Sequence, residues 1–180
     1  GVVWAPVNCG YHATDYKYGK LYQWGRKYGQ GYDESDAFVP ELVAGPVSLG
    51  IGQSKENADK FYYGLSDPRD WCTSQNDNLW NCGTEDNPVK TEYDPCPIGW
   101  RVPTHSELNY LKNNSYWATN ENAQNGRWFN DSMSNVPEVS QVFLPTSGCR
   151  NTQGGWSGAN MNRNSFGYYW SSTSSRQYAY

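Results

Sequence analysis

The chain has 180 residues, a net charge of −4, and 9 Trp and 15 Tyr residues beside few aliphatic side chains. The negative charge argues against general nucleic-acid binding, which needs a concentrated basic surface. No apolar run is long enough to cross a membrane, and the length fits a single domain, residues 1–180, with a core built from aromatic rings.

The first third is expected to form short strands and turns. Residues 2–8 alternate loosely and predict an edge strand. The aromatic side chains of Tyr16–Trp24 are expected to pack in the core. Gly25–Tyr32 combines glycines with basic residues but lacks the Gly-Lys-Ser/Thr ending of a phosphate loop, so we interpret it as a turn. Residues 47–51 favour a short strand within a loop, and residues 57–64 one helical turn.

The loop between Cys72 and Pro88 is rich in Asn and Asp. Calcium is one interpretation, because Ca²⁺ prefers several oxygen ligands. The side chains that would supply these oxygens are Asp77, Asn78, Glu85, Asp86 and Asn87. We favour the other interpretation, that these residues form turns, and expect no cofactor.

The best-defined local structure is predicted for Asp94–Leu108, with the sequence Asp-Pro-Cys-Pro-Ile-Gly-Trp-Arg-Val-Pro-Thr-His-Ser-Glu-Leu. Its prolines restrict the backbone at the entry. Thr104 and Glu107 form a capping box, in which each side chain satisfies a free amide at the start of a helix. We therefore predict a helix over His105–Lys112, ended by Asn113–Asn114. We call Asp94–Leu108 the signature segment.

The last third is expected to be rich in loops. Residues 113–133 predict a polar loop held to the body by three aromatic rings. These rings are Trp117, Trp128 and Phe129. Val139–Leu144 predicts a buried strand and Tyr168–Ser171 a second strand, with an exposed loop over residues 151–166 between them.

The cysteine content is typical of an exported protein, where disulfides persist. The five cysteines are Cys9, Cys72, Cys82, Cys96 and Cys149. Their odd number leaves one thiol without an internal partner. Cys72 and Cys82 flank a local loop and are the simplest pair, but the sequence leaves the pairing open. Neither the cysteines nor the two histidines have zinc-ligand spacing, so no zinc site is expected.

The signature segment resembles that of the Fibrobacter succinogenes major paralogous domain of Bacteroidetes surface proteins. Its Arg-Val-Pro-Thr-x-x-Glu core is also similar to the Arg-Leu-Pro-Thr-x-x-Glu segment of formylglycine-generating enzymes and other C-type-lectin-like folds. Further matching segments are Val3–Gly10, Gly19–Gly25, Phe143–Pro145, Gly148–Asn151 and Gly167–Ser172. The resemblance spans nearly the whole chain. It implies a loop-rich α+β fold of the C-type-lectin-like kind, with small antiparallel sheets and one or two short helices.

Members of that family usually continue through further strands to a cysteine. The resemblance therefore implies that the final strands of the domain lie beyond Tyr180 and that Cys96 or Cys149 pairs there. Four tryptophans are expected to be core rings, with the predicted helix packed beneath them. They are Trp4, Trp24, Trp100 and Trp170.

The C-terminal region allows two functions, catalysis and ligand binding. An enzyme of the formylglycine-generating type needs an activated thiol, for which Cys149 beside Arg150 is the candidate. A binding function fits better, because Tyr, Trp, Ser, Gly and Asn dominate antibody-like binding surfaces. The resemblance also implies a ligand surface here, one that diversity-generating retroelements rewrite in some bacterial and phage members. The predicted ligand-binding residues are Asn151, Gln153, Trp156, Asn160, Asn162, Arg163, Asn164, Ser165, Tyr168, Arg176 and Tyr178.

The chain is thus expected to be a non-enzymatic adhesion module of an exported bacterial protein, on the outer membrane or a fimbrium. The expected partner is a host glycan or surface protein, together with pilus subunits of the parent assembly. Neither nucleic acid nor an inserted membrane is expected as a partner. The sugar-binding motifs of calcium-dependent lectins are missing, so metal-free recognition is expected. A phage tail-fibre tip is the alternative on the same family analogy.

Overall fold

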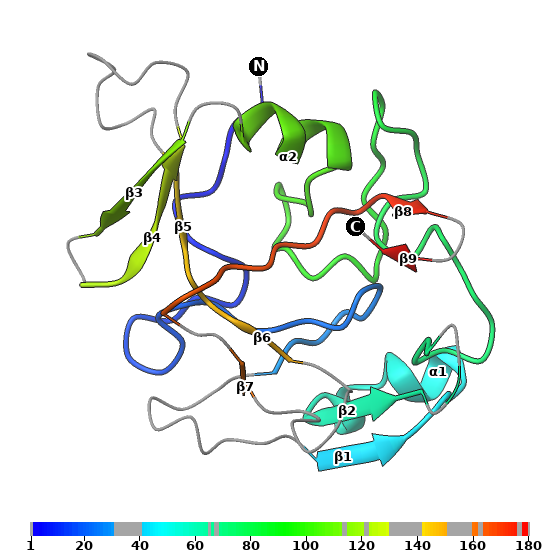
Figure 1. Ribbon diagram of the computed structural model, residues 1–180. Coiled ribbons are helices and arrows are strands. Elements are labelled where there is room, and N and C mark those ends of the chain that lie inside the picture. The colour runs from blue at the N-terminus through cyan, green and yellow to red at the C-terminus, as the bar shows by residue number, and fades with distance from the viewer. Residues whose placement is uncertain are drawn as a thin grey trace.

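The computed structural model describes residues 2–30, 41–64, 66, 69–112, 115–120, 123–129, 142–150, 160–161, 164–175 and 178–179. Within these residues, few helices and short strands in small sheets form a mixed α+β architecture (Figure 1). The helices are α1 (Leu49–Gly52), the 3-10 helix η1 (Lys55–Asn57) and α2 (His105–Lys112). The strands are β1 (Glu41–Ala44), β2 (Lys60–Tyr63), β3 (Ser115–Thr119), β4 (Asn125–Phe129), β5 (Val142–Pro145), β6 (Cys149–Arg150), β7 (Asn160–Met161), β8 (Ser174–Ser175) and β9 (Tyr178–Ala179).

The strands form separate small sheets. β3, β4 and β5 make a three-stranded antiparallel sheet, β1 and β2 a parallel pair, and β6–β7 and β8–β9 two antiparallel pairs. Figure 1 shows the three-stranded sheet at the left, α2 at the top and the β1–β2 pair with α1 at the lower right, joined by long segments without regular structure. No helix among the described residues has the length and apolar character needed to cross a membrane.

Helix α2 forms over the predicted residues, and its capping box is confirmed. The Thr104 amide donates to Glu107 Oε2 at 2.9 Å, and the Glu107 amide donates to Thr104 Oγ1 at 3.4 Å. Arg101 adds two hydrogen bonds to the same carboxylate, from Nη1 at 2.8 Å and Nη2 at 2.5 Å. The helix start is therefore held by a bidentate ion pair as well as by its cap.

A buried carboxylate, that of Asp94, closes the turn that precedes α2. It accepts from the amides of Cys96 at 2.8 Å and Val102 at 2.9 Å, and from Lys90 Nζ at 2.6 Å. Between these amides, Gly99 has φ +87°, a conformation that costs glycine little. The signature segment is thus a loop organised around one charged side chain.

The main cluster of buried apolar side chains lies beside β2. It contains Tyr62, Trp71, Cys72 and Leu79. Trp24 packs against this cluster, and its ring centroid lies 5.5 Å from that of Trp80, which is 1% exposed. The expectation of an aromatic core is confirmed for these rings. Cys72 and Cys82, the simplest pair in a pairing that the sequence leaves open, form no disulfide bond: Cys72 is buried in the core and Cys82 is exposed.

The predicted turn after Trp24 contains a fully buried arginine, Arg26. Its guanidinium donates to the carbonyls of Gly52 at 2.8 Å, Asn57 at 2.9 Å and Lys60 at 2.5 Å. It also lies 5.0 Å from the centroid of the Tyr62 ring. Burial lowers the pKa of Arg26 to about 10. The basic residue at this turn therefore joins α1, η1 and β2, and it does not face a ligand.

Several predicted strands are wrong in type or place. Residues 2–8 form no strand and are largely exposed. Residues 47–51 do not form a strand either, because Ser48 caps α1, its Oγ accepting from the Ile51 amide at 3.4 Å. The helical turn expected over residues 57–64 is replaced mainly by β2, which pairs with β1.

The region after α2 also differs from its prediction. A β-hairpin of β3 and β4 takes the place of the polar loop expected over 113–133. The predicted strand at Val139–Leu144 is confirmed in its described part, since β5 covers Val142–Pro145. Tyr168–Ser171 forms no strand, although the segment is held by a bridge between Gly148 and Gly167 just before it.

Candidate ligand-binding surface

The predicted ligand-binding residues are only partly covered by the described structure. Six of them lie outside the described residues: Asn151, Gln153, Trp156, Asn162, Arg163 and Arg176. Asn160 and Tyr178 are described in their backbone alone, in β7 and β9. Asn164, Ser165 and Tyr168 are described in full, and they lie at or next to an exposed surface.

Asn164 shapes the turn at this surface. It has φ +67°, a left-handed conformation that Asn tolerates better than most residues. Its amide donates to Thr146 O at 2.9 Å, and its side-chain oxygen accepts from Tyr18 Oη at 2.7 Å. Asn125 of β4 donates to the Asn164 carbonyl at 3.4 Å. Asn164 therefore fixes the turn against the sheet.

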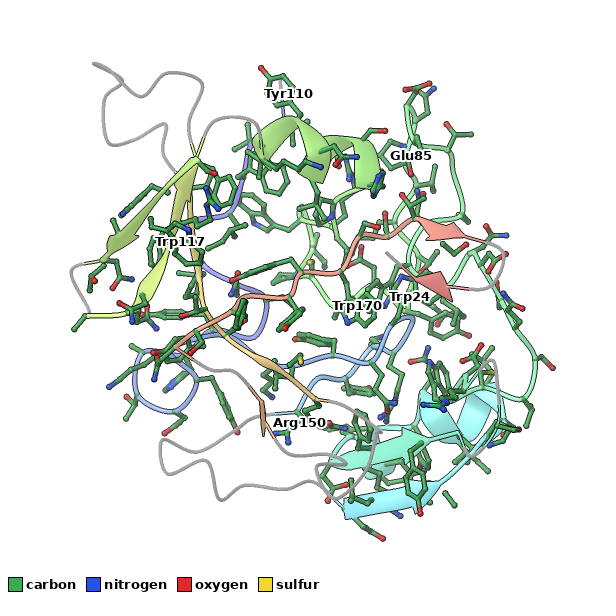
Figure 2. All side chains as sticks on the ribbon, viewed as in Figure 1. Trp24, Glu85, Tyr110, Trp117, Arg150 and Trp170 are labelled. Atoms are coloured by element: carbon green, nitrogen blue, oxygen red, sulfur yellow. The ribbon has the colours of Figure 1, made fainter. Side chains whose placement is uncertain are left out.

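A shallow pocket with a volume of about 440 Å³ lies between this turn and the β3–β4 hairpin. It is lined by Trp117, Ala118, Thr119, Asn125, Asn164 and Ser165. The Trp117 side chain is 58% exposed, and Figure 2 shows it on the hairpin at the outer side of the molecule. We call this site the Trp117 pocket.

The Trp117 ring is in contact with a cationic side chain, that of Arg127. The guanidinium carbon of Arg127, on β4, lies 5.1 Å from the ring centroid, within the range of a cation–π contact. This contact restrains an exposed ring that would otherwise rotate freely. The pocket thus combines a held aromatic face with amide and hydroxyl groups.

Two more exposed rings follow Ser165 in the chain. Phe166 and Tyr168 are 56% and 53% exposed, and their ring centroids lie 6.3 Å apart. An exposed pair of rings offers contact area at low entropic cost, as in antibody-like binding surfaces. The described part of the predicted binding region is therefore exposed and aromatic.

A large, partly open cavity of about 1460 Å³, called the central cavity below, has walls that include many aromatic side chains. Trp100 and Trp170 line it and are 38% and 42% exposed. The prediction that both are buried core rings is wrong, because one side of each ring faces the cavity. Trp4 and Trp24 are half-buried and also line the cavity.

Among the described residues, no group activates the Cys149 thiol, the candidate for enzyme chemistry. Burial raises the pKa of Cys149 above its ordinary value, whereas a nucleophilic cysteine needs a lowered pKa. The neighbouring Arg150 is itself desolvated, and burial lowers its pKa to about 10. Cys149 therefore offers little support for the formylglycine-generating alternative.

Glu85, one of the residues considered for calcium, bonds to the protein itself. The Glu85 carboxylate accepts from the Ser106 amide at 3.0 Å and from Thr173 Oγ1, at the start of α2. Burial acts to raise the pKa of Glu85, but the hydrogen bonds from Thr173 and Ser106 outweigh it and keep the pKa below 4.5. In the part of the chain that is described, no group of three or more His, Cys, Asp or Glu residues could hold a metal ion. The turn interpretation of this loop fits these contacts.

Sequence reasoning missed Trp117 and Asn125, because it did not recognise the hairpin that carries them. One signal was available: residues 115–119 contain a run of residues that favour strands, bounded by the Asn-rich turn that follows.

Comparison with protein-family models, with curated proteins and with solved structures finds no match for the chain. The functional interpretation therefore rests on the chemistry of the exposed surface and on the sequence pattern.

Proposed function

We propose that this chain is a ligand-binding module for adhesion, and that it recognises a glycan at the Trp117 pocket without a metal ion. The observation that carries the proposal is an exposed Trp ring, held by Arg127, in a pocket lined by Asn125 and Ser165. The carbon-bound hydrogens of a pyranose ring fit the negative face of an indole. Amides and hydroxyls at the rim supply donors and acceptors for sugar hydroxyls.

The proposal extends to the setting of the module. The signature segment, the capped helix after it and the small sheets support a C-type-lectin-like fold on an exported bacterial protein. The cysteine content is compatible with a cell-surface location, where disulfides persist. A place at the tip of a pilus or of a phage fibre rests on the family resemblance alone.

The test is a glycan array probed with the chain in the presence of a chelator, followed by titration of the best glycan against Trp117→Ala. We expect the variant to lose at least tenfold in affinity, roughly 1.4 kcal/mol, while its melting temperature stays unchanged because the ring is exposed. Tyr110→Ala is the matched control, since Tyr110 is an exposed ring on α2 (Figure 2), and it should bind like the wild type.

Three other outcomes would contradict a part of the proposal: the pocket, the ligand class or the metal-free mechanism. A glycan hit that survives Trp117→Ala would overturn the assignment of the pocket. Binding to an array of host surface proteins and to no glycan would replace the glycan by a protein receptor. A glycan hit abolished by the chelator would show that the metal-free mechanism is wrong.

A further inference from the structure

Two cysteines that are far apart in the chain meet at the wall of the central cavity. Cys9 and Cys96 both line the cavity and are each half-buried, and an interaction between the two thiols shifts the pKa of both. Cys9 Sγ also lies 3.2 Å from the carbonyl oxygen of Pro95, the residue before Cys96. The turn at residues 8–10 therefore contacts the start of the signature segment.

The backbone is held firmly on both sides of this contact. The Cys9 carbonyl accepts from the Lys20 amide at 3.0 Å. On the other side, the Cys96 amide donates to Asp94 at 2.8 Å, and the Cys96 carbonyl accepts from Lys90 Nζ at 2.7 Å. A disulfide needs two cysteines whose backbones already lie close together. These hydrogen bonds keep the two residues in place without a covalent bond.

The other cysteines differ in their surroundings. Cys72 is buried in the core, Cys82 is exposed with its Sγ 3.7 Å from the Val89 carbonyl, and Cys149 lies at the start of β6. The contact between Cys9 and Cys96 thus distinguishes this pair.

We propose that Cys9 and Cys96 form a disulfide bond that ties the N-terminal segment to the signature segment. This modification site is independent of the ligand proposed above. The oxidant is a disulfide donor, for example oxidised glutathione, small enough to enter the cavity.

The reaction is a pair of thiol–disulfide exchanges. The Cys9 thiolate attacks one sulfur of the donor, forms a mixed disulfide and releases the other half as a thiolate. The Cys96 thiolate then attacks Cys9 Sγ, forms the protein disulfide and releases the second half. The two thiols lose two protons and two electrons, and the donor takes them up and leaves as two thiols.

The electrostatics favour Cys9 as the first nucleophile. The hydrogen bond from Cys96 lowers the pKa of Cys9 to about 7, with help from Tyr22 Oη at 3.2 Å and against the effect of burial. The same contact raises the pKa of Cys96 above its ordinary value. A thiol whose pKa lies near neutral pH is well suited to attack a disulfide.

Trypsin separates the two cysteines cleanly, because it cuts after Lys17, Lys90 and Arg101. Cys9 falls in the peptide that ends at Lys17, and Cys96 in the peptide Thr91–Arg101, each with a single cysteine. After incubation of the full chain with oxidised glutathione and blocking of free thiols, we expect mass spectrometry of the unreduced digest to show these two peptides linked. The linked species should disappear on reduction.

Variants and a second measurement complete the test. The linked species should be absent from Cys9→Ser and Cys96→Ser and kept in the matched control Cys149→Ser. Reduction should lower the melting temperature of the wild type and of Cys149→Ser by about 5 °C or more. Recovery of Cys9 and Cys96 from the wild type as blocked free thiols, or linked to other cysteines, would overturn the proposal. The wild-type digest decides this even where a variant fails to fold.

Discussion

Three charged side chains, Arg26, Asp94 and Glu107, bond to the chain's own backbone. Arg26 is fully buried and donates to three backbone carbonyls. Asp94 is 4% exposed and accepts from two amides and from Lys90. Glu107 accepts from the Thr104 amide and from Arg101. Buried charges are tolerated when each lone pair or proton has a partner, so these residues replace the hydrogen bonds that longer sheets supply in other proteins.

The Glu107 carboxylate makes the stability of the chain depend on pH. Hydrogen bonds from Arg101 and then from Thr104 lower the pKa of Glu107 below 4.5, against the effect of burial. The stabilisation is complete above the unfolded-state pKa and is lost as pH falls through the lower folded-state pKa. We expect Glu107→Gln to cost about 1–2 kcal/mol at pH 7, because Gln keeps the cap but loses the charge. The difference should shrink below about pH 4.5.

Urea unfolding at pH 7 and at several lower values checks this prediction. Glu92→Gln is the matched control, since it removes the same charge at an exposed position and should leave the free energy of unfolding nearly unchanged at each pH. A deficit of Glu107→Gln that stays constant down to pH 3 would contradict the role of the charge.

Elements set by local signals could be predicted, and elements set by distant partners could not. α2 has its own cap, hydrogen-bonded within residues 104–107, so a short window of sequence contains the information. β1 and β2 pair in parallel across the chain segment that holds α1, and no local pattern shows that. Tyr168–Ser171 has a strand-like composition, but no described segment pairs with it, and a strand needs a continuous neighbour.

Some residues of the candidate site could likewise be predicted from the sequence, and others could not. Composition alone drew attention to Asn164, Ser165 and Tyr168, which are exposed as expected. The ring that completes the pocket, Trp117, comes from a hairpin almost fifty residues earlier and was expected to hold a loop to the body. Its exposure, 58% of the side chain, depends on what covers each face of the hairpin, which no local pattern shows.

The sheet that carries Trp117 depends on a close approach between β4 and β5 at Gly126. A Cβ atom there would lie 2.5 Å from the Leu144 carbonyl oxygen and 2.5 Å from the Phe143 ring. We expect Gly126→Ala to cost about 2–4 kcal/mol in urea unfolding, because the backbone of β5 must move. It should also weaken ligand binding at the Trp117 pocket.

Gly50→Ala provides the control for that substitution. Gly50 lies in α1, and a Cβ atom there meets nothing within 4 Å. Alanine favours a helix over glycine by up to about 1 kcal/mol, so this variant should be neutral or slightly more stable. Equal losses from the two substitutions would refute the steric explanation at Gly126.

The whole molecule is held together by tryptophans that bond to distant backbone. The indole of Trp71 donates to the Trp24 carbonyl at 2.7 Å, and that of Trp80 to the Arg26 carbonyl at 3.1 Å. Trp24 and Trp170 form a reciprocal connection, shown close together at the centre of Figure 2. Trp24 donates to the Ser171 carbonyl at 2.9 Å, and Trp170 to the Tyr22 carbonyl at 2.9 Å. The abundance of Trp therefore compensates for small sheets.

This connection predicts that Trp24→Phe loosens the C-terminal segment selectively. Phenylalanine keeps a ring but removes the N–H, which leaves the Ser171 carbonyl without that donor and costs about 1–3 kcal/mol. Hydrogen exchange followed by mass spectrometry should show faster exchange over residues 164–175. Trp128→Phe makes the same truncation in the β3–β4–β5 sheet, where Trp128 packs on Phe143, and should leave that segment unchanged. If both variants loosened residues 164–175 equally, the indole bond to Ser171 would not be what holds this segment.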